Sequence, residues 1–251
     1  MFTREKPALG VDLGEEDGFP PGFDFPQTIS VRTTSISEHR DGYAEYLEGP
    51  FRELASEQLG EEVAKEIDEA RWAISVSGSV PDPSDLALFQ AVRAFQRFLT
   101  RTAAGIAIAN DLSLRWQDAG SIALADPPGR LRIDEWIEVL YDDELRGLHT
   151  RGMEQFARPD IVVFDQPEHR LERAAQLLRH LAHLEAHGTL YADGASVKVD
   201  KVEAPGASPS QATSSTERVT VALQRLDAER CKSLAVRGGT LVVEGWPGGI
   251  A

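Results

Sequence analysis

Three of the chain's six histidines fall within the stretch HLAHLEAHG, which spans residues 180 to 188. His180, His183 and His187 are three and four residues apart, so one face of a helix would carry all of them. Two imidazoles at that spacing could chelate a metal ion from solvent, whereas catalytic zinc needs three protein ligands in a water-excluding pocket. The helical zinc-hydrolase motif also places Glu directly after the first His, and here Leu184 stands there and Glu185 lies on another face. We expect a solvated histidine face; a metal site is the less favoured alternative.

A second candidate site lies in the stretch HTRGMEQFARPDIVVF, residues 149 to 164, which we read as a turn-helix-strand junction. The binding candidates in it are His149, Thr150, Arg151 and Glu154. In a functional interpretation, His149 and Arg151 line a cleft in which the guanidinium binds a carboxylate or a phosphate. In a structural interpretation, which we favour, Thr150 caps a helix, and Met153 and Phe156 belong to the core.

Carboxylates dominate the stretch from residue 43 to 70. It holds only two basic residues, Arg52 and Lys65, against nine acidic ones: Glu45, Glu48, Glu53, Glu57, Glu61, Glu62, Glu66, Asp68 and Glu69. The whole chain has a formal net charge of −15, which disfavours nucleic acid and membrane partners because it repels phosphate groups. The same charge favours a basic protein partner, for which these residues form a docking face. A merely solvated helix surface is the simpler interpretation.

Other catalytic signatures are incomplete. The stretch SVSGS lacks the glycines that flank the serine in a nucleophile elbow, and no Gly-rich phosphate loop occurs. Cys231 is the only cysteine, which excludes an intrachain disulfide and a cysteine-rich zinc site. We expect no cofactor. Because the first residues lack the apolar run of a signal peptide, and no stretch approaches the ~20 apolar residues that span a bilayer, we expect a cytoplasmic protein.

The elements that would position these residues alternate between strands and helices. Hydrophobic periodicity predicts strands at 27–35, 71–80, 105–109, 112–116, 160–164, 195–202, 218–226 and 240–246. It predicts helices at 43–70, divided at Pro50, and at 82–104, 135–148 and 168–187. The predicted fold class is α+β, a mixed or antiparallel sheet with helices packed on one face, plus a small β-rich C-terminal unit.

The expected domain organisation has four parts. Residues 1–19 form a flexible acidic arm, and residues 20–202 form the α+β domain. Residues 203–216, rich in Ser and Pro, form a linker or loop, and residues 217–251 form the small β-rich C-terminal unit. The oligomeric state stays open.

The segments LFQAVRAFQRFLTRTAAGIAIANDLSLRW and HTRGMEQFARPDIVV resemble the bacterial group known as domain of unknown function family 4261. Members carry a helix that ends in small residues, a strand that closes on an acidic turn and a Trp, and a Thr-x-Gly-Met-x-x-Phe-Gly-x-Pro segment. The resemblance covers roughly residues 70 to 200, and this chain has Ala157 where the family often has Gly. It implies an α+β fold and a bacterial origin, and it implies no activity.

Two functions are compatible with these residues. The first is a non-enzymatic acidic protein-binding factor of the bacterial cytosol, of an immunity or regulatory kind, and we favour it because no catalytic constellation is complete. The second is a small-molecule or metal-dependent hydrolase that uses the polar cluster around His149 and Arg151. The geometry around these two residues separates the alternatives.

Overall fold

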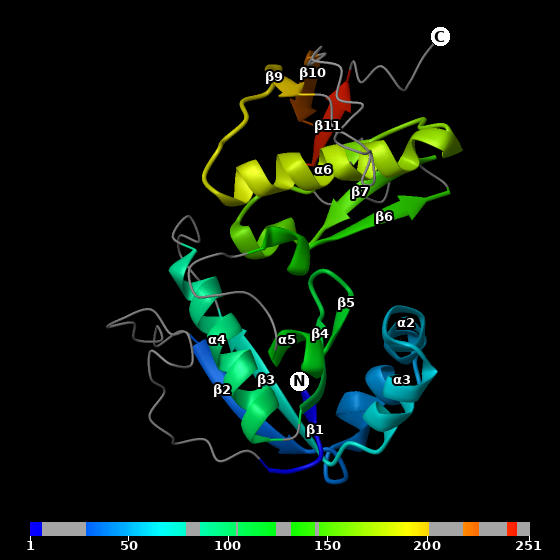
Figure 1. Ribbon diagram of the computed structural model, residues 1–251, viewed down its shortest axis with the longest axis vertical. Helices are drawn as coiled ribbons and strands as arrows, with labels where there is room; N and C mark the ends of the chain where they lie inside the picture. Colours follow the sequence, from blue (N-terminus) through cyan, green and yellow to red (C-terminus); the bar gives the residue numbers. More distant parts are fainter. Residues whose placement is uncertain are drawn as a thin grey trace, which may run out of the picture. The chain divides into compact units, whose positions relative to one another are not determined.

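The chain has the predicted α+β class, with two mostly antiparallel sheets (Figure 1). The computed structural model describes residues 1–6, 29–78, 86–103, 105–123, 132–143, 146–200, 218–225 and 240–244. Contacts divide the chain into two compact units, Met1–Arg132 and Ile133–Ala251. Within the described ranges, no helix combines the length and the apolar character needed to cross a membrane.

The sheet of the first unit has the strand order β2-β3-β1-β4-β5, and its described neighbours pair antiparallel. Its strands are β1 (Phe2–Thr3), β2 (Ile29–Ser35), β3 (Trp72–Gly78), β4 (Gly105–Asn110) and β5 (Arg115–Asp118). The expected flexible arm is therefore wrong for its first residues: β1 lies at the centre of the sheet. The reason is that Phe2, only 3% exposed, belongs to the core. Residues 7–19 of that arm lie outside the described ranges.

The helices of the first unit follow the periodicity of the sequence. Those that the structure describes are η2 (Arg40–Tyr43), α1 (Ala44–Leu47), α2 (Pro50–Leu59), α3 (Glu61–Asp68), α4 (Ala87–Thr102) and α5 (Ala119–Ala123). Pro50 begins α2, where its missing amide donor costs no hydrogen bond, so the predicted division is confirmed. Gly60, at φ 87°, makes a second division between α2 and α3.

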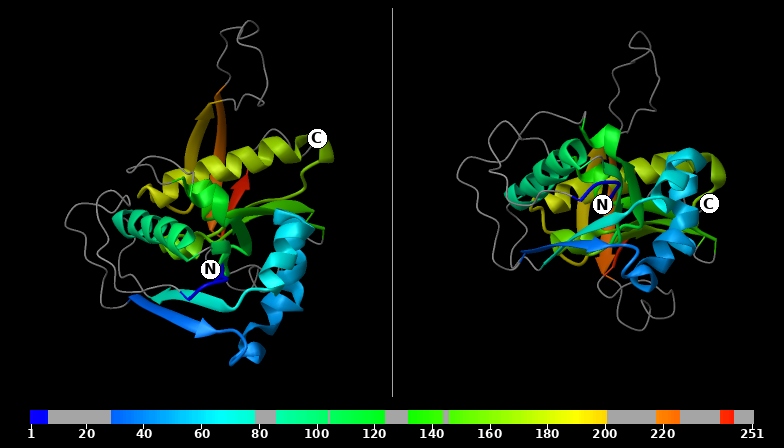
Figure 2. Two further views of the ribbon diagram at one scale, coloured as in Figure 1. Left: turned by 60° about the horizontal axis from the view of Figure 1, so that its bottom comes forward. Right: turned by 90° about the horizontal axis from the view of Figure 1, so that it is seen from below.

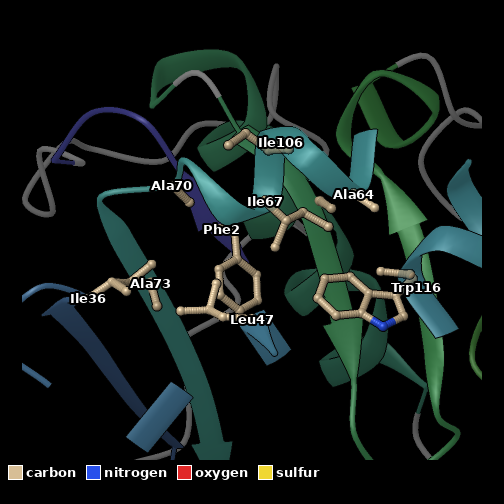
Figure 3. Packing of buried hydrophobic residues seen from close by; sticks show 11 residues of the cluster. Phe2, Ile36, Leu47, Ala64, Ile67, Ala70, Ala73, Ile106 and Trp116 are labelled. Carbon is tan, nitrogen blue, oxygen red and sulfur yellow. The ribbon is translucent and has the colours of Figure 1, made fainter. Parts of the chain in front are cut away.

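Helices cover both faces of this first sheet. Phe2 and Ala73 belong to a core cluster that includes α1–α3, whereas the adjacent Met1 and Ile74 pack with α4. Neighbouring strand residues point to opposite faces, so α1–α3 and α4 lie on opposite sides. In the first cluster, the ring of Phe2 lies 5.6 Å from that of Trp116, centroid to centroid (Figure 3).

The second unit contains a six-stranded sheet in the order β6-β7-β8-β11-β10-β9. The strands are β6 (Glu138–Asp142), β7 (Gly147–Arg151), β8 (Ile161–Val163), β9 (Ala195–Asp200), β10 (Arg218–Arg225) and β11 (Leu241–Glu244). Among its described strand pairs, β8–β11 alone is parallel. The helices within the described residues are η3 (Ile133–Glu135), η4 (Met153–Phe156), η5 (Glu168–Arg170) and α6 (Leu171–Ala186). The long helix α6 packs against β6, β7 and β8 (Figure 1).

The helix predicted at 135–148 is wrong, because β6 and β7 form an antiparallel hairpin there. Leu148 and Thr150 are buried while His149 and Arg151 are half-buried, an alternation with the period of a strand. Arg146 adopts a left-handed conformation at φ 49°, which closes the turn before Gly147.

The expected C-terminal unit, residues 217–251, does not match the division of the structure, in which the second unit is Ile133–Ala251. β9 pairs with β10 from Ala195↔Leu223 to Asp200↔Arg218, and β11 pairs with β8 (Figure 2). The C-terminal strands therefore complete the sheet of the second unit instead of forming a unit of their own. The physical reason is that each of these short strands needs a neighbour for its backbone hydrogen bonds. The predicted linker, 203–216, lies outside the described residues.

Candidate functional site

β7 presents alternate residues to the two faces of the second sheet, which separates the predicted site residues. Leu148 and Thr150 are buried, whereas His149 and Arg151 are half-buried and two residues apart on the other side. Nδ1 of His149 lies 3.2 Å from the carbonyl oxygen of Thr150. The structure thus brings His149 and Arg151 together and places the Thr150 side chain away from them.

The Thr150 hydroxyl fastens β7 to the loop before β8. It donates to Oδ1 of Asp160 at 3.2 Å and accepts from the amide of Ile161 at 2.8 Å. The amide of Met153 donates to the same Asp160 oxygen at 3.3 Å. The helix cap expected at Thr150 is therefore wrong: Thr150 lies in a strand, and Gly152, in a left-handed conformation at φ 104°, precedes η4. A fully buried hydroxyl with two structural bonds is unsuited to binding a ligand.

The two apolar residues of this segment are core residues, as the structural interpretation predicts. Met153 is 0% and Phe156 is 1% exposed. Glu154, on the same short helix, is exposed. Ala157 adopts a left-handed conformation at φ 50°, which is the backbone geometry that a glycine adopts without strain.

Asp160 is a further ionisable group beside β7, which the sequence reasoning missed; its carboxylate accepts from the Thr150 hydroxyl. Burial raises the pKa of its carboxyl group. The hydrogen bonds from Met153 and Thr150, and then the charges of His149 and Arg151, oppose this increase. Its position directly before the apolar run of β8 was the available signal, because such a position often falls at a sheet edge.

Glu185 is a second buried carboxylate that the sequence reasoning set aside. It is 2% exposed and lies on the buried face of α6, opposite the histidines. Burial raises its pKa from an ordinary value of 4.5 to about 7, although the charges of Arg158 and Arg225 act against the increase. The signal in the sequence was its spacing, four residues after Leu181 and seven after Leu178, on the helix stripe that packs against the sheet.

The histidine face is solvated, in the sense that His180, His183 and His187 are all exposed. The rings of His183 and His187 lie 4.1 Å apart, centroid to centroid, and Nδ1 of His187 lies 2.8 Å from the carbonyl oxygen of His183. Partial burial, and then the charges of the other two histidines, lower the pKa of His183. Among the described residues, no group of three His, Cys, Asp or Glu side chains is placed to hold a metal ion.

The acidic stretch forms a surface that we call the acidic face: the nine carboxylates of α1–α3 and their caps, all of them exposed. Arginines pair with four of the nine: Arg40 with Glu48, Arg52 with Glu61 and Asp68, and Arg4 with Glu66. No ion pair within the described residues joins the remaining five, which are Glu45, Glu53, Glu57, Glu62 and Glu69.

Comparisons with known proteins add no relative: no family model, no curated protein and no solved structure matches the chain. The resemblance to domain of unknown function family 4261 stays a prediction.

Proposed function

We propose that the chain is a non-enzymatic protein-binding factor of the bacterial cytosol, of an immunity or regulatory kind, whose acidic face docks a basic protein. The observation that carries this proposal is the exposure of all nine carboxylates of that face, five of them without an ion pair among the described residues. Neighbouring like charges on a helix, such as Glu53 and Glu57, repel each other weakly. A basic partner would remove this repulsion, and the negative field would accelerate its encounter with the face.

Affinity capture from cells at low and high salt tests the proposal. The wild type is compared with an E53Q/E57Q/E62Q variant, which neutralises three unpaired positions of the acidic face. A matched control, E38Q/E168Q/E172Q, removes three exposed carboxylates elsewhere. We expect a basic partner that binds the wild type and the control at low salt and dissociates at high salt.

We expect the acidic-face variant to recover little of that partner. Recovery of no partner at low salt, or an equal loss with the control variant, would contradict the proposal. All three proteins should melt at similar temperatures, because exposed substitutions change stability little.

The alternative function is a small-molecule or metal-dependent hydrolase, and one observation favours it: Asp160 interacts electrostatically with both His149 and Arg151. In this hypothesis His149 is the general base and Arg151 binds the anionic group of the substrate. Turnover of chromogenic esters and phosphates is the measurement. This alternative predicts turnover that an H149A substitution abolishes without a change in melting temperature, and a wild type without turnover would contradict it.

A further inference from the structure

The turn between β4 and β5, residues 111–114, presents an apolar side chain to solvent beside the acidic face. Leu112, in this turn, is 39% exposed. The β4–β5 hairpin packs against α2, one of the helices of the acidic face (Figure 1). Contact between an apolar side chain and water is unfavourable, so a partner that covers Leu112 would gain binding free energy.

Side-chain hydrogen bonds hold this turn in place. Oδ1 of Asn110 accepts from the amide of Leu112 at 3.2 Å. From α2, the side-chain amide of Gln58 donates to the carbonyl oxygen of Leu114 at 3.1 Å and accepts from the amide of Trp116 at 2.7 Å. Leu114 adopts a left-handed conformation at φ 56°, and the bond from Gln58 fixes its carbonyl group. A turn that is ordered before binding lowers the entropy cost of association.

Carboxylates of the acidic face adjoin the same turn. The hydroxyl of Tyr46, on α1, donates to the carboxylate of Asp111, the exposed first residue of the turn. Glu45 precedes Tyr46 in the chain and interacts with it electrostatically. On α2, Glu57 precedes Gln58. Glu45 and Glu57 are two of the five carboxylates of the acidic face that have no ion pair within the described ranges. Negative charge therefore surrounds the apolar side chain.

Two partly exposed aromatic rings extend the apolar surface from the turn toward α2. Tyr46 and Phe51 are half-buried, and their ring centroids lie 5.0 Å apart. Aromatic faces attract guanidinium and ammonium groups, and neighbouring carboxylates add to that attraction. The combination of Leu112, these rings and the carboxylates suits a partner segment in which large apolar side chains stand beside cationic ones.

We propose that the 111–114 turn is the apolar contact point of the acidic face: Leu112 packs against a large apolar side chain of a basic partner segment, whose Lys or Arg side chains bind Asp111, Glu45 and Glu57. The inference rests on the proposed docking function and deepens it, because the partner segment has to be amphipathic as well as basic. Charge accelerates the encounter and is screened by salt, whereas the apolar contact is not.

Two synthetic peptides of equal length and equal positive charge test this inference, one of Lys and Leu and the other of Lys and Ser. Their dissociation constants are measured by isothermal titration calorimetry at low salt. We expect the wild type to bind the Lys–Leu peptide about tenfold more tightly, because the burial of one Leu side chain contributes on this order. An L112S substitution should remove most of this preference.

The matched control is L190S, which changes a leucine of the second unit that is 75% exposed. It should retain the wild-type preference for the Lys–Leu peptide. Both substitutions are at exposed positions, so the melting temperatures should stay close to that of the wild type. Affinity for the Lys–Ser peptide should be the same in the wild type, L112S and L190S, because none of these changes alters a charge.

The outcomes distinguish this inference from the docking function on which it rests. If the wild type binds both peptides equally, and E53Q/E57Q/E62Q binds both more weakly, the docking function is unaffected and the role of Leu112 is wrong. An L190S variant that loses as much of the preference as L112S does would also overturn the inference. If the acidic-face variant binds both peptides as tightly as the wild type does, the docking function fails and the inference fails with it.

Discussion

The carboxylates of this chain occupy two contrasting environments. On the acidic face they lie in water on the outer surface of α1–α3, and there a partner such as Ser56 or Arg52 lowers the pKa of Glu61. At the end of α6 burial dominates, and the pKa of Glu185 rises instead. A carboxylate therefore has opposite electrostatic surroundings in the two units: polar partners favour the ionised form of Glu61, and burial favours the protonated form of Glu185.

Removal of the buried apolar side chains of the second unit should have the largest effect. Met153 and Phe156 anchor the segment that presents Asp160, and both are fully buried. A change of either to Ala should lower the free energy of unfolding by roughly 2 to 5 kcal/mol through the cavity that it leaves. Chemical denaturation measures the loss. An E154A control at an exposed neighbour should change little, and unaltered stability in both apolar variants would mean that the segment is not part of the core.

A change of Asp160 to Ala tests whether stability depends on the Asp160 carboxylate as a hydrogen-bond acceptor. It would leave the buried Thr150 hydroxyl and Met153 amide without their shared acceptor. The expected cost is about 2 kcal/mol, because an unsatisfied buried donor is expensive. D160N keeps one acceptor oxygen and should cost less. Equal losses in D160A and D160N, measured by denaturation at neutral pH, would show that the negative charge matters more than the acceptor.

A change of Arg52 to Ala tests the ion pairs of the acidic face. Arg52 binds both carboxylate oxygens of Asp68, at 2.8 and 3.1 Å, and connects α2 to α3. We expect a loss of about 1 kcal/mol, at the upper end for a surface pair, because the geometry is bidentate. The loss should shrink in 1 M salt, where exposed charges are screened. A loss that is independent of salt would point to the packing of the Arg52 stem.

Substitution of the histidine face should have the smallest effect. H183Q/H187Q should cost well under about 1 kcal/mol at pH 7, as exposed changes usually do. The pKa of His183 is lowered, so the folded state disfavours its charged form. Relative to the variant, the wild type should therefore lose a little stability as the pH falls through 6.5. Thermal melts at pH 5.5 and 7.5 measure this difference, and zinc that copurifies in stoichiometric amount would contradict the solvated interpretation.

Periodicity predicted most of the regular elements. The division at Pro50, the apolar stripe of α4 and the leucine face of α6 agree with the structure, because each depends on local spacing. The hairpin β6–β7 was missed, since Glu and Leu in that stretch also favour a helix and the pairing decides between them. The place of Phe2 in a central strand depends on contacts with residues more than 70 positions away, which no local pattern contains.

The sequence indicated some residues of the candidate site and missed others. His149 and Arg151 stood out by residue type, and their shared side of β7 follows once the strand is known. Asp160 and Glu185 differ from other carboxylates because burial raises their pKa values. Their burial depends on the packing of elements that are far apart in the sequence. A carboxylate on an apolar stripe is the general signal that would have found Glu185, four residues after Leu181.

The most direct test of the contrast between the two sets of carboxylates is the change in melting temperature between pH 5.5 and 8 for three proteins: the wild type, E185Q and E53Q/E57Q/E62Q. Ordinary carboxylates are already ionised at pH 5.5. The Met1 ammonium, whose pKa burial lowers to about 6, and His183, whose pKa is also lowered, titrate in this range but are common to the three proteins. Measured against E185Q, the wild type and the acidic-face variant should therefore lose stability in parallel as the pH rises, by about 2 kcal/mol. If the wild type and E185Q change equally with pH, the assignment of proton binding to the buried carboxylate is wrong.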